Sequence, residues 1–219
     1  MGQRTAILVK KQVSPRQAEI NLIHHQWGIG KTLPMLFMEQ VISSEYPLDR
    51  SWQRNKLEES YNFEPLSSEK DNYIYKERVL PTEVDVWNIE TIKDYFEITD
   101  NNNGGMIIEV TPVPKSSDEE IDWESSFIGL HVKVGFVLGS EECSVYYENK
   151  RTNTYVNRKL EEPFSRLVSA REFMLKTGAS YVPSDFIKCW NGFVATFGIE
   201  EAVSSVKSKK KVNKEVVTC

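Results

Sequence analysis

The hydrophobic pattern at the start of the chain predicts a β-hairpin followed by a helix. Two short apolar runs, 5–11 and 20–24, lie on either side of a polar turn at Ser14-Pro15, and runs of this kind around a turn are typical of paired strands. Apolar residues then return at helical spacing, which predicts a helix over 32–46 with Thr32 as its N-cap.

The middle of the chain predicts further strands. Residues 106–113 and 127–138 are rich in strand formers, and the first of these runs follows an Asn- and Gly-rich turn at 101–105. A short helix is predicted for 89–96 and a second hairpin for 144–156. With the first hairpin, these segments predict an antiparallel or mixed sheet of about four to six strands.

Two helices are predicted near the C-terminus. Apolar residues recur at helical spacing between Phe164 and Leu175, with Pro163 before them and Gly178 after them. A second helix is predicted for 183–198. Because each helix has one apolar face, we expect both to pack on the sheet, which predicts the α+β class.

Two segments lack such a pattern. Residues 47–83 are polar and charged without sustained periodicity, which predicts a long surface insertion within a single domain, 1–203. Residues 204–219 are basic and poor in large apolar side chains, which predicts a flexible basic tail.

Composition and net charge exclude only a few classes of function. The 219 residues are 40% hydrophobic and carry a net charge of −5, which supports a sizeable core and argues against a surface shaped throughout for nucleic acid. The three cysteines lack C-x-x-C spacing and predict reduced thiols. No apolar run approaches the roughly 20 residues that cross a bilayer, so we expect a cytoplasmic protein without membrane contact.

The sharpest chemical motif, residues 28–32, resembles part of a phosphate-binding loop between a strand and a helix. The full motif requires a glycine where this chain has His25. A phosphate-binding loop also follows a buried parallel strand, whereas we expect the residues before this motif to form one strand of a hairpin. We therefore favour glycines that permit a tight turn, with an anion- or nucleotide-binding site as the alternative. The residues of that site would be Gly28, Gly30, Lys31 and Thr32.

Acidic and histidine residues give weaker signals. His24 and His25 are neighbours on a predicted strand, so they point to opposite faces and cannot grip one metal; either could act with His131 only if the fold joins their strands. An acidic cluster lacks the EF-hand glycine, so we expect a solvated loop or a surface for a partner. Its members are Asp118, Glu119, Glu120, Asp122 and Glu124. We predict no metal and no cofactor.

Four segments make the sequence resemble small uncharacterised proteins of phages and prophages of Gram-positive bacteria. They are RTAILVKK (4–11), LIHHQWGIGK (22–31), LFMEQV (36–41) and NNNGGMIIEV (101–110). The resemblance brings no established activity or site residues. It implies an accessory protein of a phage or mobile element that binds a host macromolecule, for example an inhibitor of a bacterial defence system.

These observations favour a non-enzymatic binding protein whose partner is a host protein. The acidic cluster and the polar insertion are the expected contact surfaces. Two alternatives stay open: a nucleotide-binding or nucleotide-processing protein that uses residues 28–32, and a nucleic-acid binder that uses the basic tail.

Overall fold

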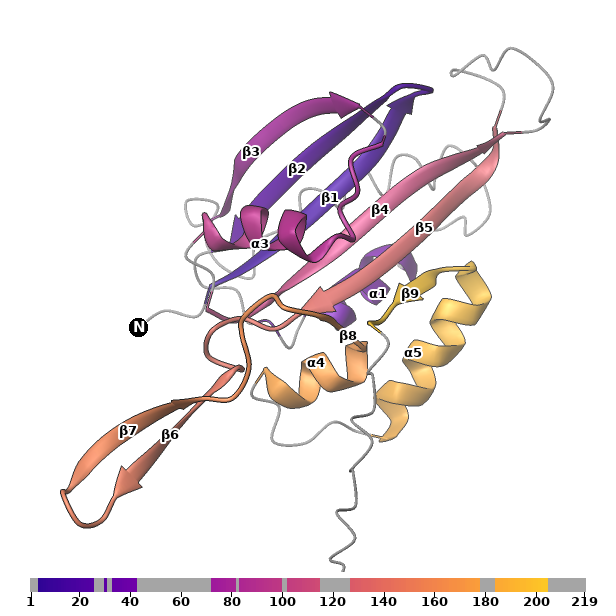
Figure 1. Ribbon diagram of the computed structural model, residues 1–219. Coiled ribbons are helices and arrows are strands. Elements are labelled where there is room, and N and C mark those ends of the chain that lie inside the picture. Colours follow the sequence, from indigo (N-terminus) through magenta and orange to yellow (C-terminus); the bar gives the residue numbers. More distant parts are fainter. Residues whose placement is uncertain are drawn as a thin grey trace, which may run out of the picture.

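The computed structural model shows a mixed β-sheet with helices on both of its faces (Figure 1). Within the described residues the sheet has seven strands, in the order β3-β2-β1-β4-β5-β8, with β9 also paired to β5. The α+β class and the mixed sheet are therefore confirmed. The structure describes residues 4–25, 30, 33–42, 72–81, 83–99, 102–114, 127–177 and 184–204.

Three antiparallel strands form one side of the sheet. β1 (Thr5–Ser14) and β2 (Gln17–His25) make the predicted hairpin, and β3 (Asn72–Pro81) pairs with the other edge of β2. Residues 72–81 of the segment predicted as an insertion, 47–83, thus form a strand of the sheet, while 47–71 and 82 lie outside the described residues. A register shift between Leu22 and Ile23 in the β2–β3 pairing interrupts the two-residue alternation that identifies a strand in sequence.

Long-range pairing completes the sheet. β4 (Gly105–Pro114) runs parallel to β1 and antiparallel to β5 (Phe127–Val137), as Figure 1 shows. The far edge of β5 pairs with two short strands, β8 (Leu167–Val168) and β9 (Glu200–Ala202). The predicted strands 106–113 and 127–138 are confirmed, whereas the sequence pattern predicted neither β8 nor β9.

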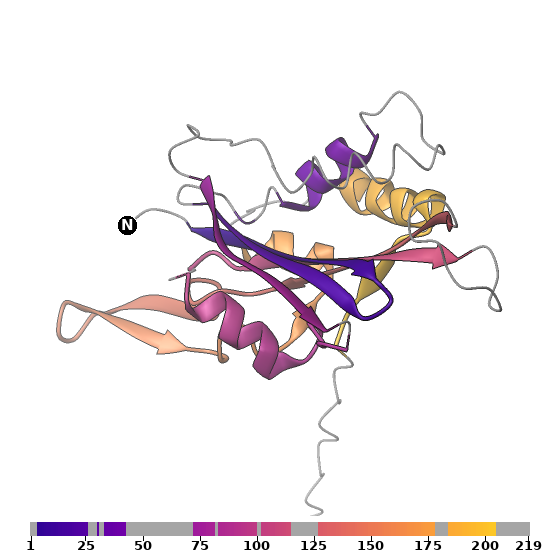
Figure 2. The same cartoon turned by 90° about the horizontal axis from the view of Figure 1, so that it is seen from above.

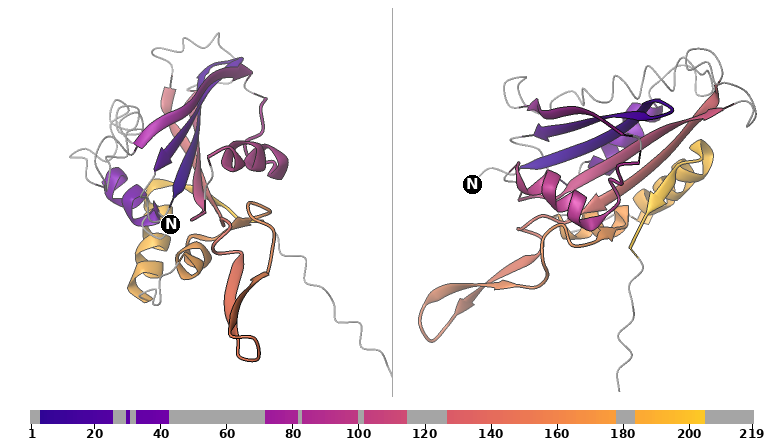
Figure 3. Two further views of the ribbon diagram at one scale, coloured as in Figure 1. Left: turned by 90° about the vertical axis from the view of Figure 1, so that its left-hand side faces the viewer. Right: turned by 45° about the horizontal axis from the view of Figure 1, so that its top comes forward.

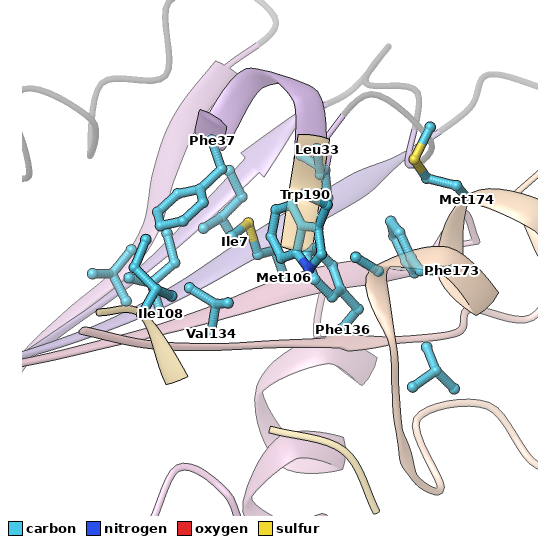
Figure 4. Close-up of a cluster of buried hydrophobic side chains, with 14 of the residues drawn as sticks. Ile7, Leu33, Phe37, Met106, Ile108, Val134, Phe136, Phe173, Met174 and Trp190 are labelled. Atoms are coloured by element: carbon cyan, nitrogen blue, oxygen red, sulfur yellow. The ribbon is translucent and has the colours of Figure 1, made fainter. Parts of the chain in front are cut away.

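Three helices cover one face of the sheet: α1 (Leu33–Ile42), α4 (Ala170–Lys176) and α5 (Ser184–Phe197) (Figure 2). Their apolar side chains meet the sheet in an aromatic core (Figure 4). The ring centroids of Phe136 and Phe173 are 5.1 Å apart, and those of Phe136 and Trp190 are 5.7 Å apart. The predicted packing of the C-terminal helices on the sheet is confirmed. No helix among the described residues combines the length and the hydrophobicity that a bilayer crossing requires.

The opposite face carries a single described helix, α3 (Ile89–Glu97), close to the helix predicted for 89–96. The side chain of Asn88 caps it by accepting a hydrogen bond from the Glu90 amide at 2.9 Å. Phe96 packs so close to β4 that a Cβ on Gly105 would lie 2.0 Å from its ring. This second core therefore requires a glycine at the start of β4.

The helix predicted between Phe164 and Leu175 is wrong in its first half. Phe164 has a φ of 54°, β8 follows it, and α4 begins only after Ser169, whose hydroxyl accepts from the Glu172 amide. Phe164 and Leu167 are buried in the second core, Phe164 from a turn and Leu167 from β8. The spacing of these apolar residues therefore matches that of a helix, although the segment is not helical. The helix predicted for 183–198 is confirmed, and Gly198, with a φ of 62°, follows its end.

Four directly opposed residues form a row of alternating charge across the sheet: Lys10 on β1, Glu109 on β4, Lys133 on β5 and Glu200 on β9. We call this set the charge row. The Nζ of Lys10, a residue only 7% exposed, lies 2.8 Å from Glu109 Oε1 and donates to the Val84 carbonyl at 2.7 Å.

Trp87 covers the middle of the charge row. Its indole N–H donates to Glu109 Oε2, and the Nζ of Lys133 lies 4.9 Å from the centre of its ring system. Lys133 Nζ is also 3.0 Å from Glu200 Oε1. Opposite charges on directly opposed residues stabilise one register of a strand pair, so the charge row favours the observed alignment of β1, β4 and β5.

We expect Glu109→Gln to lower the free energy of unfolding by about 3 kcal/mol, because it leaves the buried ammonium of Lys10 without a carboxylate. The matched control is Glu200→Gln, since the Glu200 side chain is 49% exposed and exposed pairs contribute less than about 1 kcal/mol. Urea unfolding of both variants measures the difference. Equal losses would contradict the role assigned to the Lys10–Glu109 pair.

Candidate functional site: a projecting hairpin and its root

A two-stranded hairpin projects from the body of the molecule (Figures 1 and 3). It consists of β6 (Ser144–Asn149) and β7 (Thr154–Lys159), which, among the described strands, pair only with each other. We call residues 144–159 the arm. The hairpin predicted for 144–156 is thereby confirmed, and its second strand continues to Lys159. An isolated two-stranded hairpin is marginally stable in water, so the arm depends on its attachment to the body.

Asn149 organises the tip of the arm. Its carbonyl accepts hydrogen bonds from the amides of Thr152 and Asn153, at 3.1 and 2.8 Å, and its side-chain oxygen accepts from the Arg151 amide at 3.1 Å. Asn153 has a φ of 52°, a left-handed conformation that asparagine tolerates. The resulting loop holds Lys150 and Arg151 at the tip, both exposed.

Pairing between the two strands distributes aromatic side chains over both faces of the arm. Tyr147 is opposite Val156 and Tyr155 is opposite Glu148, which places the two tyrosines on opposite faces. Tyr155 is 77% exposed and Tyr147 is 50% exposed. Large aromatic side chains in such positions gain nothing from the core and point to an interaction surface.

The arm differs in charge from the rest of the chain. It carries four cationic residues and one acidic residue, a net charge of +3, while the whole chain carries −5, so the remaining residues carry −8. The cations are Lys150, Arg151, Arg158 and Lys159, and the acidic residue is Glu148.

Backbone hydrogen bonds close the root of the arm, by which we mean the flanking residues 139–143 and 160–161. The Cys143 carbonyl, just before β6, accepts from the amides of Leu160 and Glu161 just after β7, at 2.7 and 3.3 Å. Burial raises the pKa of the Cys143 thiol to about 12, with smaller contributions from nearby carboxylates. The thiol therefore stays protonated at neutral pH, and it serves packing rather than nucleophilic chemistry.

An ion-pair network holds the segment after the arm to α4. The carboxylate of Glu161 accepts from Arg166 Nε at 3.0 Å and from Lys176 Nζ at 2.9 Å, and Arg166 Nη2 donates to Glu172 Oε1 at 2.5 Å. Burial acts to raise the pKa of Glu161, but the hydrogen bonds from Arg166 and Lys176 outweigh it and hold the pKa below its usual value. The hydrogen bond from Arg166 likewise lowers the pKa of Glu172.

The turn that leads into the arm is tied to the loop before β4. Glu141 accepts from the side-chain amides of Asn102 and Asn103, at 2.8 and 3.2 Å. Its neighbour Glu142 accepts from the Gly139 amide at 2.9 Å. Burial raises the pKa of Glu142 to about 7, although hydrogen bonds from backbone amides partly oppose this. Hydrogen bonds and ion pairs thus fix both strands of the arm at its root.

Gly30 has a structural reason to be glycine. It is buried, its amide donates to Asn103 Oδ1 at 2.8 Å, and a Cβ would lie 2.2 Å from the Asn103 carbonyl oxygen. The preceding strand β2 is antiparallel to both neighbours, unlike the parallel strand before a phosphate-binding loop. These findings favour the tight-turn interpretation. Gly28, Lys31 and Thr32 lie outside the described residues.

Among the described residues, the structure does not bring the candidate histidines together in one site. His131 on β5 lies level with Ala18 on β2, three strands away across the sheet. Ala18 is six residues from His24, which adds a separation of roughly 20 Å along β2 alone. Its Nε2 lies 3.4 Å from Glu200 Oε2 instead. In the part of the chain that the structure describes, no group of three His, Cys, Asp or Glu residues could hold a metal. The acidic cluster, Asp118, Glu119, Glu120, Asp122 and Glu124, lies outside that part.

Comparison with protein-family models, with curated proteins and with solved structures finds no match for this chain. The sequence pattern predicted the hairpin but not its role as a projecting surface. The available signal was compositional: three tyrosines and four cations lie within the sixteen residues of the arm.

We expect the stability of the wild type, relative to a Glu142→Gln variant, to fall as the pH rises from about 4.5 to about 7. The folded protein raises the pKa of Glu142, so it favours the protonated carboxyl, and this stabilisation is complete below the unfolded pKa and lost above the folded one. The glutamine side chain keeps an acceptor for the Gly139 amide without a charge. Urea midpoints of both proteins across this range measure the effect, and parallel curves would contradict it.

Proposed function

We propose that this protein is a non-enzymatic binding protein that contacts a macromolecule through the arm. The observation that carries the proposal is the combination of a projecting position and exposed aromatic side chains, above all Tyr155, at 77% exposure. The exposed Leu160 at the root extends this apolar surface. Tyrosine is enriched at interfaces because it combines a large apolar ring with a polar hydroxyl and little conformational entropy.

The anchoring of the root supports binding. The hydrogen bonds of Cys143 join the two ends of the arm. Glu141 ties the chain before the arm to the loop at 102–103, and the Glu161–Arg166–Glu172–Lys176 network holds the chain after it. A preorganised surface loses less conformational entropy on association than a mobile one. The described groups with the most strongly raised acid pKa values, Glu142 and Cys143, belong to this root. They serve its structure and do not supply a catalytic centre.

The resemblance to phage and prophage proteins supports a role inside a bacterial host cell. On this proposal the partner is a host macromolecule, and inhibition of a defence system is one role that such binding could serve. The arm replaces the acidic cluster and the polar insertion as the principal contact surface. The nucleotide-binding alternative loses support, because the Gly30 amide is bonded to Asn103 within the protein.

A photoreactive side chain at position 155, tested in host cells, should form a covalent adduct with the partner, because Tyr155 is the most exposed large side chain among the described apolar residues. The matched control is position 13 in the β1–β2 hairpin, where Val13 is 37% exposed. Adducts are detected as shifted bands on denaturing gels. Equal labelling at both positions, or none at 155, would refute the arm as the contact surface.

A further inference from the structure

We infer that the partner of the arm is duplex DNA, whose major groove receives the hairpin. This inference rests on the proposed binding function and adds the class of partner. Its first support is charge, because the arm concentrates a net charge of +3 on a chain whose remaining residues carry −8. Phosphate backbones attract the arm and repel the acidic body, so the electrostatic field would orient the arm toward the nucleic acid.

The cations of the arm are available for phosphate contacts. Among the described residues, the side chains of Lys150, Arg151 and Arg158 form no hydrogen bond or ion pair. Only Lys159 is engaged, with its Nζ 2.5 Å from Glu162 Oε2. Several cations of the body are paired with carboxylates instead: Lys10, Lys133, Arg166 and Lys176.

The dimensions of the arm fit the groove. Each strand has six residues, which span about 20 Å, and two paired strands are about 5 Å apart. The major groove of B-form DNA is about 12 Å wide and admits a two-stranded ribbon, whereas the deep, narrow major groove of A-form RNA does not admit side chains. The geometry therefore favours DNA over double-stranded RNA.

The distribution of side chains suits insertion between two phosphate backbones. Tyr147 and Tyr155 lie on opposite faces of the ribbon, so each would face one wall of the groove. Their hydroxyls can donate to phosphate oxygens or base edges. Lys150 and Arg151 at the tip, with Arg158 near the root, place cations at both ends of the inserted segment.

Fluorescence anisotropy tests the inference with the full chain and a labelled duplex of mixed sequence, about 25 base pairs long, in about 50 mM salt. We expect micromolar binding that weakens steeply with salt. The variant Lys150→Gln/Arg158→Gln should lose at least about tenfold in affinity and reduce the slope of log K against log salt by about 2. Matching urea midpoints confirm that these exposed substitutions leave the fold intact.

Two control variants show which part of the chain is responsible for DNA binding. Arg16→Gln/Lys188→Gln removes the same two residue types from exposed positions on the body and should bind as the wild type does. Lys209→Gln/Lys210→Gln/Lys211→Gln removes charge from the basic tail and should leave the contribution of the arm to the salt slope in place. If only the tail variant weakens binding, the inference is overturned.

Other results of these binding measurements also decide whether the arm binds duplex DNA. An absence of binding to duplex DNA, or an arm variant that binds like the wild type, overturns the inference. Digestion of the adduct formed at position 155 separates this failure from that of the proposed function. An adduct that nuclease removes supports DNA, whereas an adduct that resists nuclease and is lost to protease shows a protein partner, which keeps the binding function and refutes DNA.

Discussion

The ion pair between Lys10 and Glu109 fixes how the two parts of the sheet meet. β1 to β3 form one antiparallel unit and β4 with β5 another, and only the parallel β1–β4 pairing joins them. A slip of one residue would turn Lys10 toward the aromatic core around Phe136 and Trp190. Because burying an unpaired ammonium there is costly, the ion pair excludes this alternative register.

The position of the arm follows from that register. β5 pairs with β4 in the register that places Lys133 opposite Glu109, and its end leads through the turn at 139–143 into β6. The chain returns from β7 through Glu161 and Arg166 to β8, which pairs with β5 again. The two connections of the arm therefore lead from β5 and to its neighbour β8, so the direction of the arm is set by this edge of the central sheet.

Sequence patterns predicted the elements whose periodicity is local. The first hairpin, the helix at 89–97 and the helix at 184–197 follow from spacing and turn residues. The patterns failed where tertiary contacts decide the structure: β8 and β9 have two and three residues and exist through pairing with β5. Phe164 adopts a positive φ that a helical pattern does not predict. The arm was predictable as a hairpin, but its isolation from the sheet, which makes it a site, depends on the rest of the fold.

The distance along the chain between Lys10 and Glu109 has a consequence for biosynthesis. The two residues are separated by about 100 positions, and ribosomes add about 5–20 residues each second. The first hairpin therefore leaves the ribosome several seconds before its carboxylate partner exists. During that interval the edge of β1 that later pairs with β4 is open, while the charge of Lys10 remains hydrated and opposes edge-to-edge association with other nascent chains. The same lysine thus protects the unfinished sheet and later aligns the completed one.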